Sequence, residues 1–217
     1  MKVCTDACIF GAWVVQQNIN LTHVLDIGAG TGLLMHIIAQ AGASNITGIE
    51  IEEGAFVQCS ENIAYNHWAG KMTLVHSDIK NFKPAVKYDF VITNPPFYEN
   101  DLISETATTA IARHSTKLNL SELIQLIPDL LTDEGKFAIL LPWHRKANLL
   151  NLAEKHGLYP LNLLTLKHSP KHSPFRIIGI FSTRNNKPPA EEVLIIREED
   201  SYTKEFISLL QPYYLYL

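Results

Sequence analysis

Apolar and polar residues follow two different periods along the first two thirds of the chain. Short, almost continuous apolar runs such as HVLDIG and YDFVIT are typical of strands buried on both faces. Longer segments repeat their apolar residues every three or four positions, as amphipathic helices do. This pattern predicts strands at 23–28, 45–51, 72–78, 88–93 and 135–142. It predicts helices at 33–42, 53–67, 121–131 and 144–157. Strands that alternate with helices favour a parallel sheet covered by helices on both faces.

Some predicted helix ends carry residues suited to that place. Ser121 is placed to cap the helix at 121–131, because its hydroxyl can accept a hydrogen bond from a free backbone N–H of the first turn. Glycine favours the left-handed backbone that often ends a helix, and Gly42 and Gly157 end two of the predicted helices.

The last third of the chain has a different pattern. Segments 158–169 and 175–183 lack helical periodicity and are joined by a stretch rich in proline and lysine, which predicts a long hairpin. A further strand at 192–198 and a short helix at 202–211 follow. We therefore expect a mostly parallel sheet with an antiparallel edge.

Composition restricts the class of protein. The chain has 217 residues, 47% hydrophobic and 18% charged, which indicates one globular domain. No apolar run approaches the roughly 20 residues of a membrane span, so we expect no membrane association. Three cysteines without a CxxC pair indicate a reducing cytoplasm and no structural metal. The net charge of −4 means that a nucleic-acid partner would need a local basic patch.

The stretch LDIGAGTG is the first candidate ligand site. Asp26 ends a predicted strand, and Gly28, Ala29 and Gly30 begin the turn into a helix. Glycines let a ligand approach the backbone closely, but this spacing differs from that of dinucleotide pyrophosphate sites. Asp26 disfavours a phosphate and suits a ligand with a positive amino group. The alternative is a helix-capping turn without a ligand.

Acidic residues also end the next two predicted strands. Glu50, followed by Ile51, lies at about the spacing from the glycine turn at which a carboxylate meets a ribose hydroxyl pair. Asp78, followed by Ile79, can accept a hydrogen bond from an adenine amine. The alternatives are an exposed Glu at a strand end and an Asp that caps a turn. Together the three motifs describe an adenosine ligand without phosphates.

The stretch NPPFY follows the strand at 88–93 and is unusually stiff. Pro95 and Pro96 cannot continue a strand ladder because neither has an N–H, and a residue before proline is held extended. Asn94 is therefore fixed at a strand end, with Phe97 just beyond it. The alternative is a purely structural turn stiffened by proline.

These motifs resemble those of the Rossmann-like S-adenosylmethionine-dependent methyltransferases, over about residues 20 to 142. The resemblance implies a class I fold with a mostly parallel seven-stranded sheet and an antiparallel edge hairpin. It implies S-adenosyl-L-methionine as donor and S-adenosyl-L-homocysteine as product. The cofactor residues by this resemblance are Asp26, Gly28, Ala29, Gly30, Glu50, Ile51, Asp78, Ile79 and Asn94.

Within those enzymes, Asn-Pro-Pro-aromatic is the signature of methylation at a planar nitrogen. The lone pair of such a nitrogen is delocalised, so the nitrogen is a poor nucleophile. The Asn94 side chain and the Pro95 carbonyl can accept its two N–H hydrogens and turn the lone pair toward the methyl group. Phe97 can stack on the base, and the prolines, Pro96 included, keep the acceptors rigid. No strong general base is required.

Three longer stretches resemble the bacterial tRNA1(Val) (adenine-N6)-methyltransferases: MKVCTDACIFGAW, NPPFYENDLIS…ARHSTKLNLSELI and YTKEFISLLQPYYLYL. This resemblance covers nearly the whole chain and implies methylation of adenine 37, just 3′ of the anticodon. It places Thr5 and Asp6 near the cofactor, the alternative being that they cap the first helix. It also implies one methyltransferase domain at 1–217, with a helix or lid at 1–20, a cofactor-binding and catalytic core at 21–142 and a C-terminal part at 143–217.

Two features depart from that family's pattern. Members usually carry a short strand-forming segment before the K-V-x-T-D stretch, whereas this sequence begins at Met1. Cys4 and Cys8 stand where glycine-like residues are usual. We expect the amino-terminal lid to differ from other members for these reasons.

Two basic clusters are candidates for binding the tRNA backbone, because they stand out against an acidic background. The candidate tRNA-binding residues are Arg113, His114, Lys117, Lys171 and Arg176. For the cluster around Lys171, the alternative is a solvated hairpin tip. We expect tRNA as partner and no obligate protein partner.

Three other functions stay open at this point. A guanine-N2 RNA methyltransferase or a protein-glutamine N5 methyltransferase would use Asn-Pro-Pro in the same way. The glutamine enzymes carry a helical domain before the glycine turn, and only 25 residues precede Asp26 here. A non-catalytic scaffold on the same fold would keep the glycine turn but could lose Asn94 or Phe97, and both are present.

Overall fold

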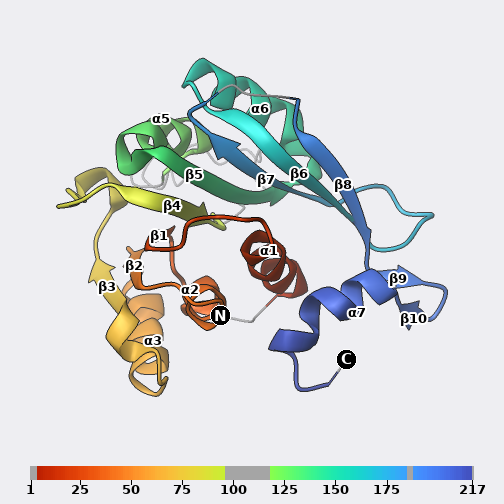
Figure 1. The fold of residues 1–217 in the computed structure, drawn as a ribbon, viewed down its shortest axis with the longest axis horizontal. Coiled ribbons are helices and arrows are strands. Elements are labelled where there is room, and N and C mark those ends of the chain that lie inside the picture. Colours follow the sequence, from red (N-terminus) through yellow and green to blue (C-terminus); the bar gives the residue numbers. More distant parts are fainter. Residues whose placement is uncertain (1–3, 96–117, 185–187, 217) are drawn as a thin grey trace, which may run out of the picture.

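The fold is an eight-stranded sheet between two layers of helices (Figure 1). This computed structural model describes residues 4–95, 118–184 and 188–216. The strand order is β3-β2-β1-β4-β5-β7-β6-β8. The strands are β1 His23–Ile27, β2 Asn45–Glu50, β3 Met72–His76, β4 Tyr88–Thr93, β5 Leu131–Pro142, β6 Tyr159–Lys167, β7 Arg176–Ser182 and β8 Ala190–Ile195. A separate small hairpin joins β9 Arg197–Glu198 to β10 Ser201–Tyr202.

Helices cover both faces of the sheet. The α-helices are α1 Thr5–Val15, α2 Leu33–Gln40, α3 Glu53–Ala64, α5 Leu120–Leu130, α6 Lys146–Lys155 and α7 Lys204–Leu210. The short 3-10 helices are η1 Ala69–Lys71, η2 Ile79–Asn81, η3 Trp143–Arg145 and η4 Gln211–Tyr213. In Figure 1, α5 and α6 lie on one side of the sheet, and α1, α2 and α7 lie on the other. No helix of the described residues is long and apolar enough to cross a membrane.

An apolar core lies on each face of the sheet, and the central strands contribute side chains to both cores. Along β4, Phe90 and Ile92 join the core beneath α1, α2 and α7, while Val91 joins the core beneath α5 and α6. Along β5, Ala138 joins the core beneath α1, α2 and α7, while Phe137 joins the core beneath α5 and α6. Successive side chains of a strand point to opposite faces, so a strand buried on both faces is apolar at every position. This explains the continuous apolar runs of the sequence.

The predicted parallel sheet forms, with eight strands in place of the seven that the family resemblance implies. Strands β1 to β5 pair in parallel, and the predicted β6–β7 hairpin forms, with β7 antiparallel to both β5 and β6. The hairpin is not the edge of the sheet, because β8 pairs in parallel with β6 beyond it. Pairing with β8 satisfies backbone groups of β6 that an edge strand would leave exposed.

The capping of α5 corrects one expectation. Asn119, not Ser121, is the cap: its Oδ1 accepts from Glu122 N at 2.9 Å, and Glu122 Oε2 accepts from Asn119 N at 3.0 Å. This reciprocal pair spans three residues and starts the helix at Leu120, so Ser121 falls inside it. Gly42 and Gly157 follow α2 and α6 with φ of 102° and 71°, as expected for helix ends.

Most element bounds differ from the predicted ones by one to four residues. β5 begins at Leu131 rather than 135, directly after α5. α6 begins at Lys146 because the preceding three residues form a 3-10 turn. Ends of elements carry few apolar residues, so periodicity alone places them poorly.

Candidate active site

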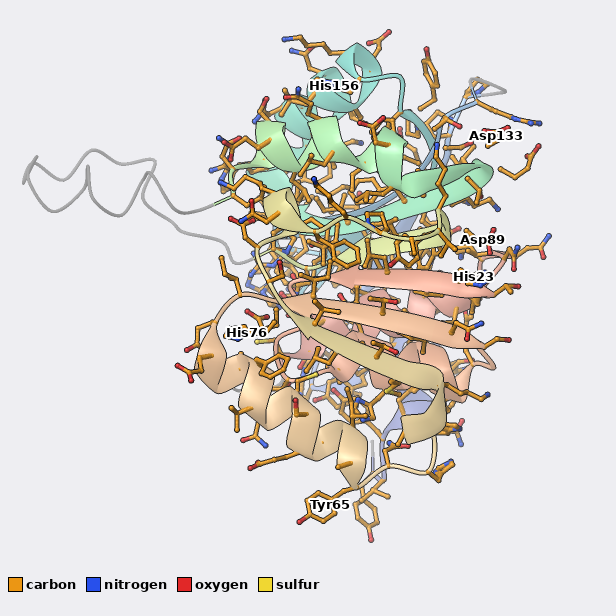
Figure 2. The ribbon with its side chains drawn as sticks, turned by 90° about the vertical axis from the view of Figure 1, so that its left-hand side faces the viewer. His23, Tyr65, His76, Asp89, Asp133 and His156 are labelled. Atoms are coloured by element: carbon orange, nitrogen blue, oxygen red, sulfur yellow. The ribbon has the colours of Figure 1, made fainter. Side chains whose placement is uncertain are left out.

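The predicted site residues gather at the carboxyl edge of the sheet, where β1, β2 and β4 end. Ile27 is paired with Ile49 on one side and with Thr93 on the other, so the glycine turn, Glu50 and Asn94 lie at the ends of three adjacent strands. Figure 2 shows this edge at His76, which ends β3, while His23 and Asp89 lie at the opposite edge. Ligands of open α/β sheets bind at the carboxyl edge.

The glycine turn is tight and leaves room for a ligand. Gly28 and Gly30 have φ of 74° and 58°, values that L side chains rarely adopt. The N–H groups of Gly28 and Ala29 both donate to Ile49 O, at 2.8 and 3.0 Å, which ties the turn to β2. A Cβ built on Gly28 would meet no atom within 4 Å. The turn therefore presents an open stretch of backbone, as a closely bound ligand requires.

Asp26 is the most unusual polar residue of the site. It is completely buried, and neither carboxyl oxygen has a hydrogen-bond partner among the described residues. Burial, with a smaller contribution from the charge of Glu50, raises the pKa of Asp26 to about 7. An unpaired buried acceptor is costly. A cationic ligand group would stabilise the ionised carboxylate, so this residue fits the predicted amino group.

Glu50 braces the glycine turn. Its Oε2 accepts from Gly30 N at 2.8 Å, and its Oε1 accepts from Ile51 N and Glu52 N at 2.9 and 2.8 Å. Only 7% of Glu50 is exposed, so it is not the solvated Glu of the alternative interpretation. A carboxylate offers about four acceptor positions, which leaves one for a ligand hydroxyl. Its predicted contact with a ribose stays a prediction.

Ile51 offers an apolar surface beside Glu50. Ile51 is 56% exposed, so its aliphatic side chain is accessible at the carboxyl edge. His76 Nε2 lies 3.1 Å from Ile51 O, and the His76 ring stacks on Phe56 next to it.

Asp78 has a structural role that the sequence left as an alternative. Its Oδ1 accepts from Lys80 N at 2.9 Å and caps η2, and Lys80 Nζ lies 4.0 Å from its Oδ2. Ile79 is buried in the core. A capping role does not conflict with a contact to adenine, and that contact stays a prediction.

Asn94 is held at the edge by a residue that sequence reasoning missed. Thr93, which is 1% exposed, donates from Oγ1 to Ile27 O at 2.8 Å and so joins the end of β4 to the end of β1. Asn94 Oδ1 is buried and has no partner among the described residues. Pro95 is described, whereas Pro96 and Phe97 lie outside the described residues. A polar, β-branched residue ending an apolar strand was the available signal for Thr93.

Only two of the five predicted tRNA-binding residues are described by the structure, and they differ in their surroundings. Arg113, His114 and Lys117 lie outside the described residues. Lys171 is exposed in the turn between β6 and β7. Arg176 begins β7, and its Nε donates to Asp6 Oδ2 at 2.8 Å. Arg176 therefore holds α1 against β7, and its contact with tRNA stays a prediction.

The start of α1 differs from the helix-capping alternative for Thr5 and Asp6. Cys4 is the N-terminal cap and makes no side-chain capping bond, while Asp6 accepts from Ala7 N at 3.0 Å. Thr5 is exposed at the first position of the helix, on the side of the β6–β7 turn. No described contact joins Thr5 to the glycine turn, and its contact with the cofactor stays a prediction.

The geometry suits chemistry at a neutral planar amine. An open glycine turn, an unpartnered carboxylate and an unpartnered amide oxygen lie at the ends of adjacent strands. Acceptors of this kind bind N–H groups and stabilise positive charge that develops on nitrogen.

Known proteins share this architecture. A predicted O-methyltransferase from Agrobacterium tumefaciens superposes with a TM-score of 0.70 at 14% identity, over 94% of this chain and 95% of that one. A putative RNA methyltransferase from Pyrococcus horikoshii does so with a TM-score of 0.59 at 22% identity, over 81% of each chain. These likenesses confirm the Rossmann-like methyltransferase fold.

Sequence comparison gives a narrower result. The methyltransferase small domain family matches residues 11–146. The chain is 38% identical to a tRNA1(Val) (adenine(37)-N6)-methyltransferase of Dyadobacter fermentans, over 99% of this chain and 91% of that protein. It is 32% identical to a protein of the same name from Bacteroides thetaiotaomicron, over 100% of this chain and 92% of that protein. The chain thus carries a methyltransferase small domain and belongs to the bacterial tRNA1(Val) (adenine-N6)-methyltransferase family.

Proposed function

We propose that this protein transfers a methyl group from S-adenosyl-L-methionine to the exocyclic N6 amine of an adenine in tRNA. The expected position is adenine 37 of tRNA1(Val), after the names of the relatives. The observation that carries the proposal is the buried, unpartnered Asn94 Oδ1 beside the glycine turn. We propose that the protein acts in the cytoplasm, because its tRNA substrate is found there.

The residues of the glycine turn and its neighbours fit the methyl donor. S-adenosyl-L-methionine, when bound, supplies an electrophilic methyl group on a positively charged sulfonium. Asp26 would face the cationic part of this ligand, and Gly28 would let it approach the backbone. Glu50 has an acceptor position left for a ribose hydroxyl, and Ile51 offers an apolar face for adenine. Groups suited to the cationic part, the ribose and the adenine of this donor thus lie at one edge of the sheet, which supports the proposal.

Asn94 and Pro95 would orient the substrate amine. The Asn94 side-chain oxygen and the Pro95 backbone oxygen accept its two N–H hydrogens, which aims the nitrogen lone pair at the methyl group. The same oxygens stabilise the positive charge that develops on nitrogen. Thr93 is the positioning residue, because its bond to Ile27 O fixes the end of β4 relative to the glycine turn.

An anticodon-loop target suits a protein that is acidic overall. Unpaired bases are partly unstacked, so moving one into a site costs less than flipping a base out of a duplex. A protein with a net charge of −4 then needs local contacts rather than a general attraction to phosphate. Lys171 offers one such local charge at the carboxyl edge.

The test is an assay that identifies the methylated product. Unmodified bacterial tRNA and S-adenosyl-L-methionine with a labelled methyl group are incubated with the protein, and the RNA is digested to nucleosides. We expect N6-methyladenosine, identified by mass and retention, and its loss in Asn94→Ala. If the product were N2-methylguanosine, the target base would be guanine rather than adenine. Label in a glutamine of a protein, with none in RNA, would contradict the proposal.

A further inference from the structure

Two hairpins at the carboxyl edge enclose a pocket outside the site described above. The β6–β7 turn lies against the β9–β10 hairpin (Figure 1), where Ile196 N donates to Lys167 O at 2.9 Å and Arg197 N to His168 O at 3.0 Å. The pocket between them has a volume of about 340 Å³. Its lining residues are Thr5, Asp6, His168, Phe175, Ile196, Arg197 and Tyr202. We call it the hairpin pocket.

Planar side chains are stacked in two sets along this pocket. The His168 ring stacks on Phe175 with centroids 3.9 Å apart and an interplanar angle of 11°. Tyr202 stacks on Phe206 at 4.6 Å, and the Arg197 guanidinium lies 4.2 Å from the Tyr202 centroid. Rings of His and the guanidinium plane of Arg are surfaces on which unpaired RNA bases stack. The pocket therefore has the chemistry of a base site.

The charges around the pocket favour a base over a phosphate. Asp6 pairs with Arg176, so this ion pair adds no net charge. The β9–β10 hairpin carries Glu198, Glu199 and Asp200 next to Arg197, all exposed. Three carboxylates beside Arg197 weaken its attraction for a phosphate. The binding of a neutral planar group, such as a base, is weakened much less by these carboxylates.

The strand registers place the hairpin pocket near Asn94 but apart from it. Thr93 is paired with Ile139 on β5, and Pro142 of β5 is paired with Arg176, next to Phe175. With about 3.3 Å per residue and about 4.8 Å per strand, Asn94 and Arg176 lie roughly 12 Å apart. A base in the hairpin pocket would therefore be a different base from the one at Asn94, within reach of the same loop.

We propose that the hairpin pocket binds an unpaired base of the substrate RNA, in the same loop as the methylated adenine, by stacking on Arg197 and His168. The inference rests on the proposed function above and adds to it a substrate-recognition site. It assigns to the two C-terminal hairpins the task of holding the loop while Asn94 holds the target amine.

The test separates stacking from charge. Arg197→Ala, Arg197→Lys and His168→Ala are compared with the wild type for kcat, for KM of an unmodified tRNA transcript and for the dissociation constant of an anticodon-loop oligonucleotide. Stacking of one base accounts for about a 5- to 150-fold change in affinity. We expect KM and the dissociation constant to rise by such a factor in all three variants, with kcat at saturating tRNA and affinity for S-adenosyl-L-methionine unchanged. Lysine keeps the charge and loses the plane, so Arg197→Lys should resemble Arg197→Ala.

Two controls guard this comparison. Arg184 is an exposed arginine that pairs with Glu134 beyond the end of β7, at the opposite edge of the sheet. Arg184→Ala removes the same charge there and should leave RNA binding unchanged. Abasic substitution of single loop nucleotides should weaken binding to the wild type at one position, and Arg197→Ala should be insensitive at that same position.

The outcomes distinguish the two proposals. Unchanged RNA affinity in Arg197→Ala and His168→Ala overturns the hairpin pocket, whether or not the wild type methylates RNA. Full retention of affinity in Arg197→Lys, with a smaller salt slope in Arg197→Ala, shows a phosphate contact and also overturns it. A wild type that methylates no RNA refutes the proposed function, and the loop-binding measurement then decides on the pocket by itself.

Discussion

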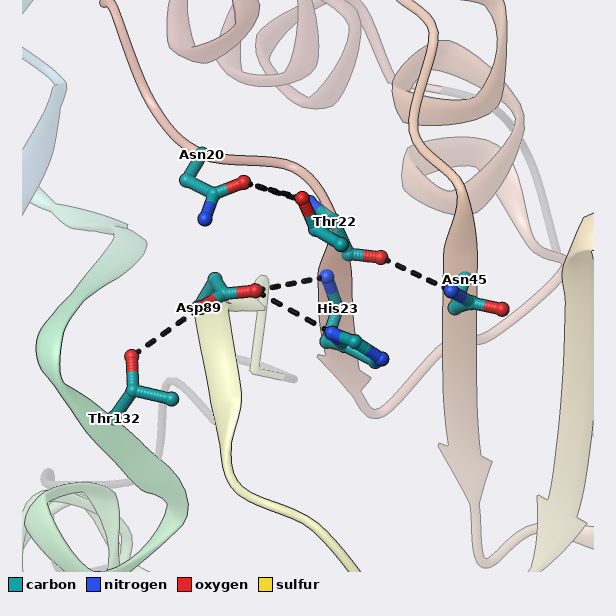
Figure 3. Close-up of polar contacts among 6 residues, drawn as sticks. All are labelled: Asn20, Thr22, His23, Asn45, Asp89 and Thr132. Carbon is teal, nitrogen blue, oxygen red and sulfur yellow. Dashed lines mark hydrogen bonds and ion pairs between the residues drawn. The ribbon is translucent and has the colours of Figure 1, made fainter.

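The two edges of the sheet use their polar residues in opposite ways. At the amino edge, Asp89 Oδ2 accepts from His23 N at 3.2 Å and lies 3.5 Å from His23 Nδ1, while its Oδ1 accepts from Thr132 Oγ1 at 3.4 Å (Figure 3). At the carboxyl edge, both oxygens of Asp26 and Oδ1 of Asn94 are buried without a partner among the described residues. Asp89 at the amino edge is satisfied by its neighbours, whereas Asp26 and the Asn94 oxygen at the carboxyl edge are left without partners among the described residues.

This difference teaches which polar cluster to regard as functional. The amino edge holds a hydroxyl, an imidazole and a carboxylate, which are the groups of a hydrolase triad. Its carboxylate, however, stands between the other two and also binds a backbone N–H, so the cluster joins the starts of β1, β4 and β5. A buried polar group without a partner costs about 1–3 kcal/mol, and a fold retains it where a ligand supplies the partner. Buried acceptors without a hydrogen-bond partner therefore indicate the functional site better than a cluster of catalytic-type side chains that bond to one another.

The largest effect is expected from Asp26→Asn. The raised pKa of about 7 means that native Asp26 keeps its proton between about pH 4 and pH 7, where the unfolded chain loses it. The native state binds more protons there, so the wild type loses stability as pH rises through this window, by up to roughly 4 kcal/mol for about three pKa units. Asp26→Asn should lack this loss, be more stable above pH 7, and bind S-adenosyl-L-methionine poorly. Urea denaturation at several pH values measures the first effect, and calorimetry the second.

Asp89→Asn is the matched control at the amino edge. It removes a carboxylate that accepts two hydrogen bonds, so it should lower the free energy of unfolding by about 1–2 kcal/mol. The two Asp→Asn changes should thus have opposite signs above pH 7. Parallel pH profiles for Asp26→Asn and the wild type would contradict the assignment of the raised pKa to Asp26.

The next effect is expected from Asn94→Ala. Removing an acceptor of the transition state should lower kcat by about 100- to 1,000-fold, with little change in the affinity for S-adenosyl-L-methionine. The free energy of unfolding should not fall, because the lost oxygen has no partner in the described fold. Single-turnover methylation of tRNA measures the rate. Asn45→Ala at the amino edge, where Asn45 Nδ2 donates to Thr22 O at 3.4 Å, should keep full activity.

Thr93→Val should show a smaller, mixed effect. The change keeps the shape of the side chain and removes the bond to Ile27 O, which should lower the free energy of unfolding by about 1–2 kcal/mol. The end of β4 would then be less firmly held, so kcat should fall while KM for tRNA changes little. Thr73→Val at an exposed position of β3 should change neither quantity. A Thr93→Val enzyme with wild-type kcat would show that Thr93 only stabilises the fold.

The smallest effect is expected from His23→Ala. The His23 side chain is 44% exposed and that of Asp89 is 19% exposed, and such surface pairs contribute about 0–1 kcal/mol. Methylation should be unchanged. A loss of activity without a loss of stability would contradict the contrast between the two edges, because it would assign a function to the amino edge.

Much of the fold was predictable because its signals are local. The five parallel strands and the four predicted helices follow from apolar period, and Gly42 and Gly157 mark helix ends by their backbone preference. The cap of α5 was misplaced because Asn119 and Ser121 are both good caps, and only the capping box with Glu122 decides between them. The strand β8 was predicted, but its pairing partner and its place at the sheet edge were not.

The sequence by itself determined the alternation of strands and helices, the glycine turn and the positions of Asp26, Glu50 and Asn94, because each depends on residues close together in the chain. The tertiary structure decided which polar groups find partners. In the folded chain Asp89 is hydrogen-bonded to His23, Arg176 to Asp6 and Thr93 to Ile27 O. Both oxygens of Asp26 and Oδ1 of Asn94 have no hydrogen-bond partner among the described residues. Pairing across 66 or 170 residues depends on strand order and register, which no local pattern encodes.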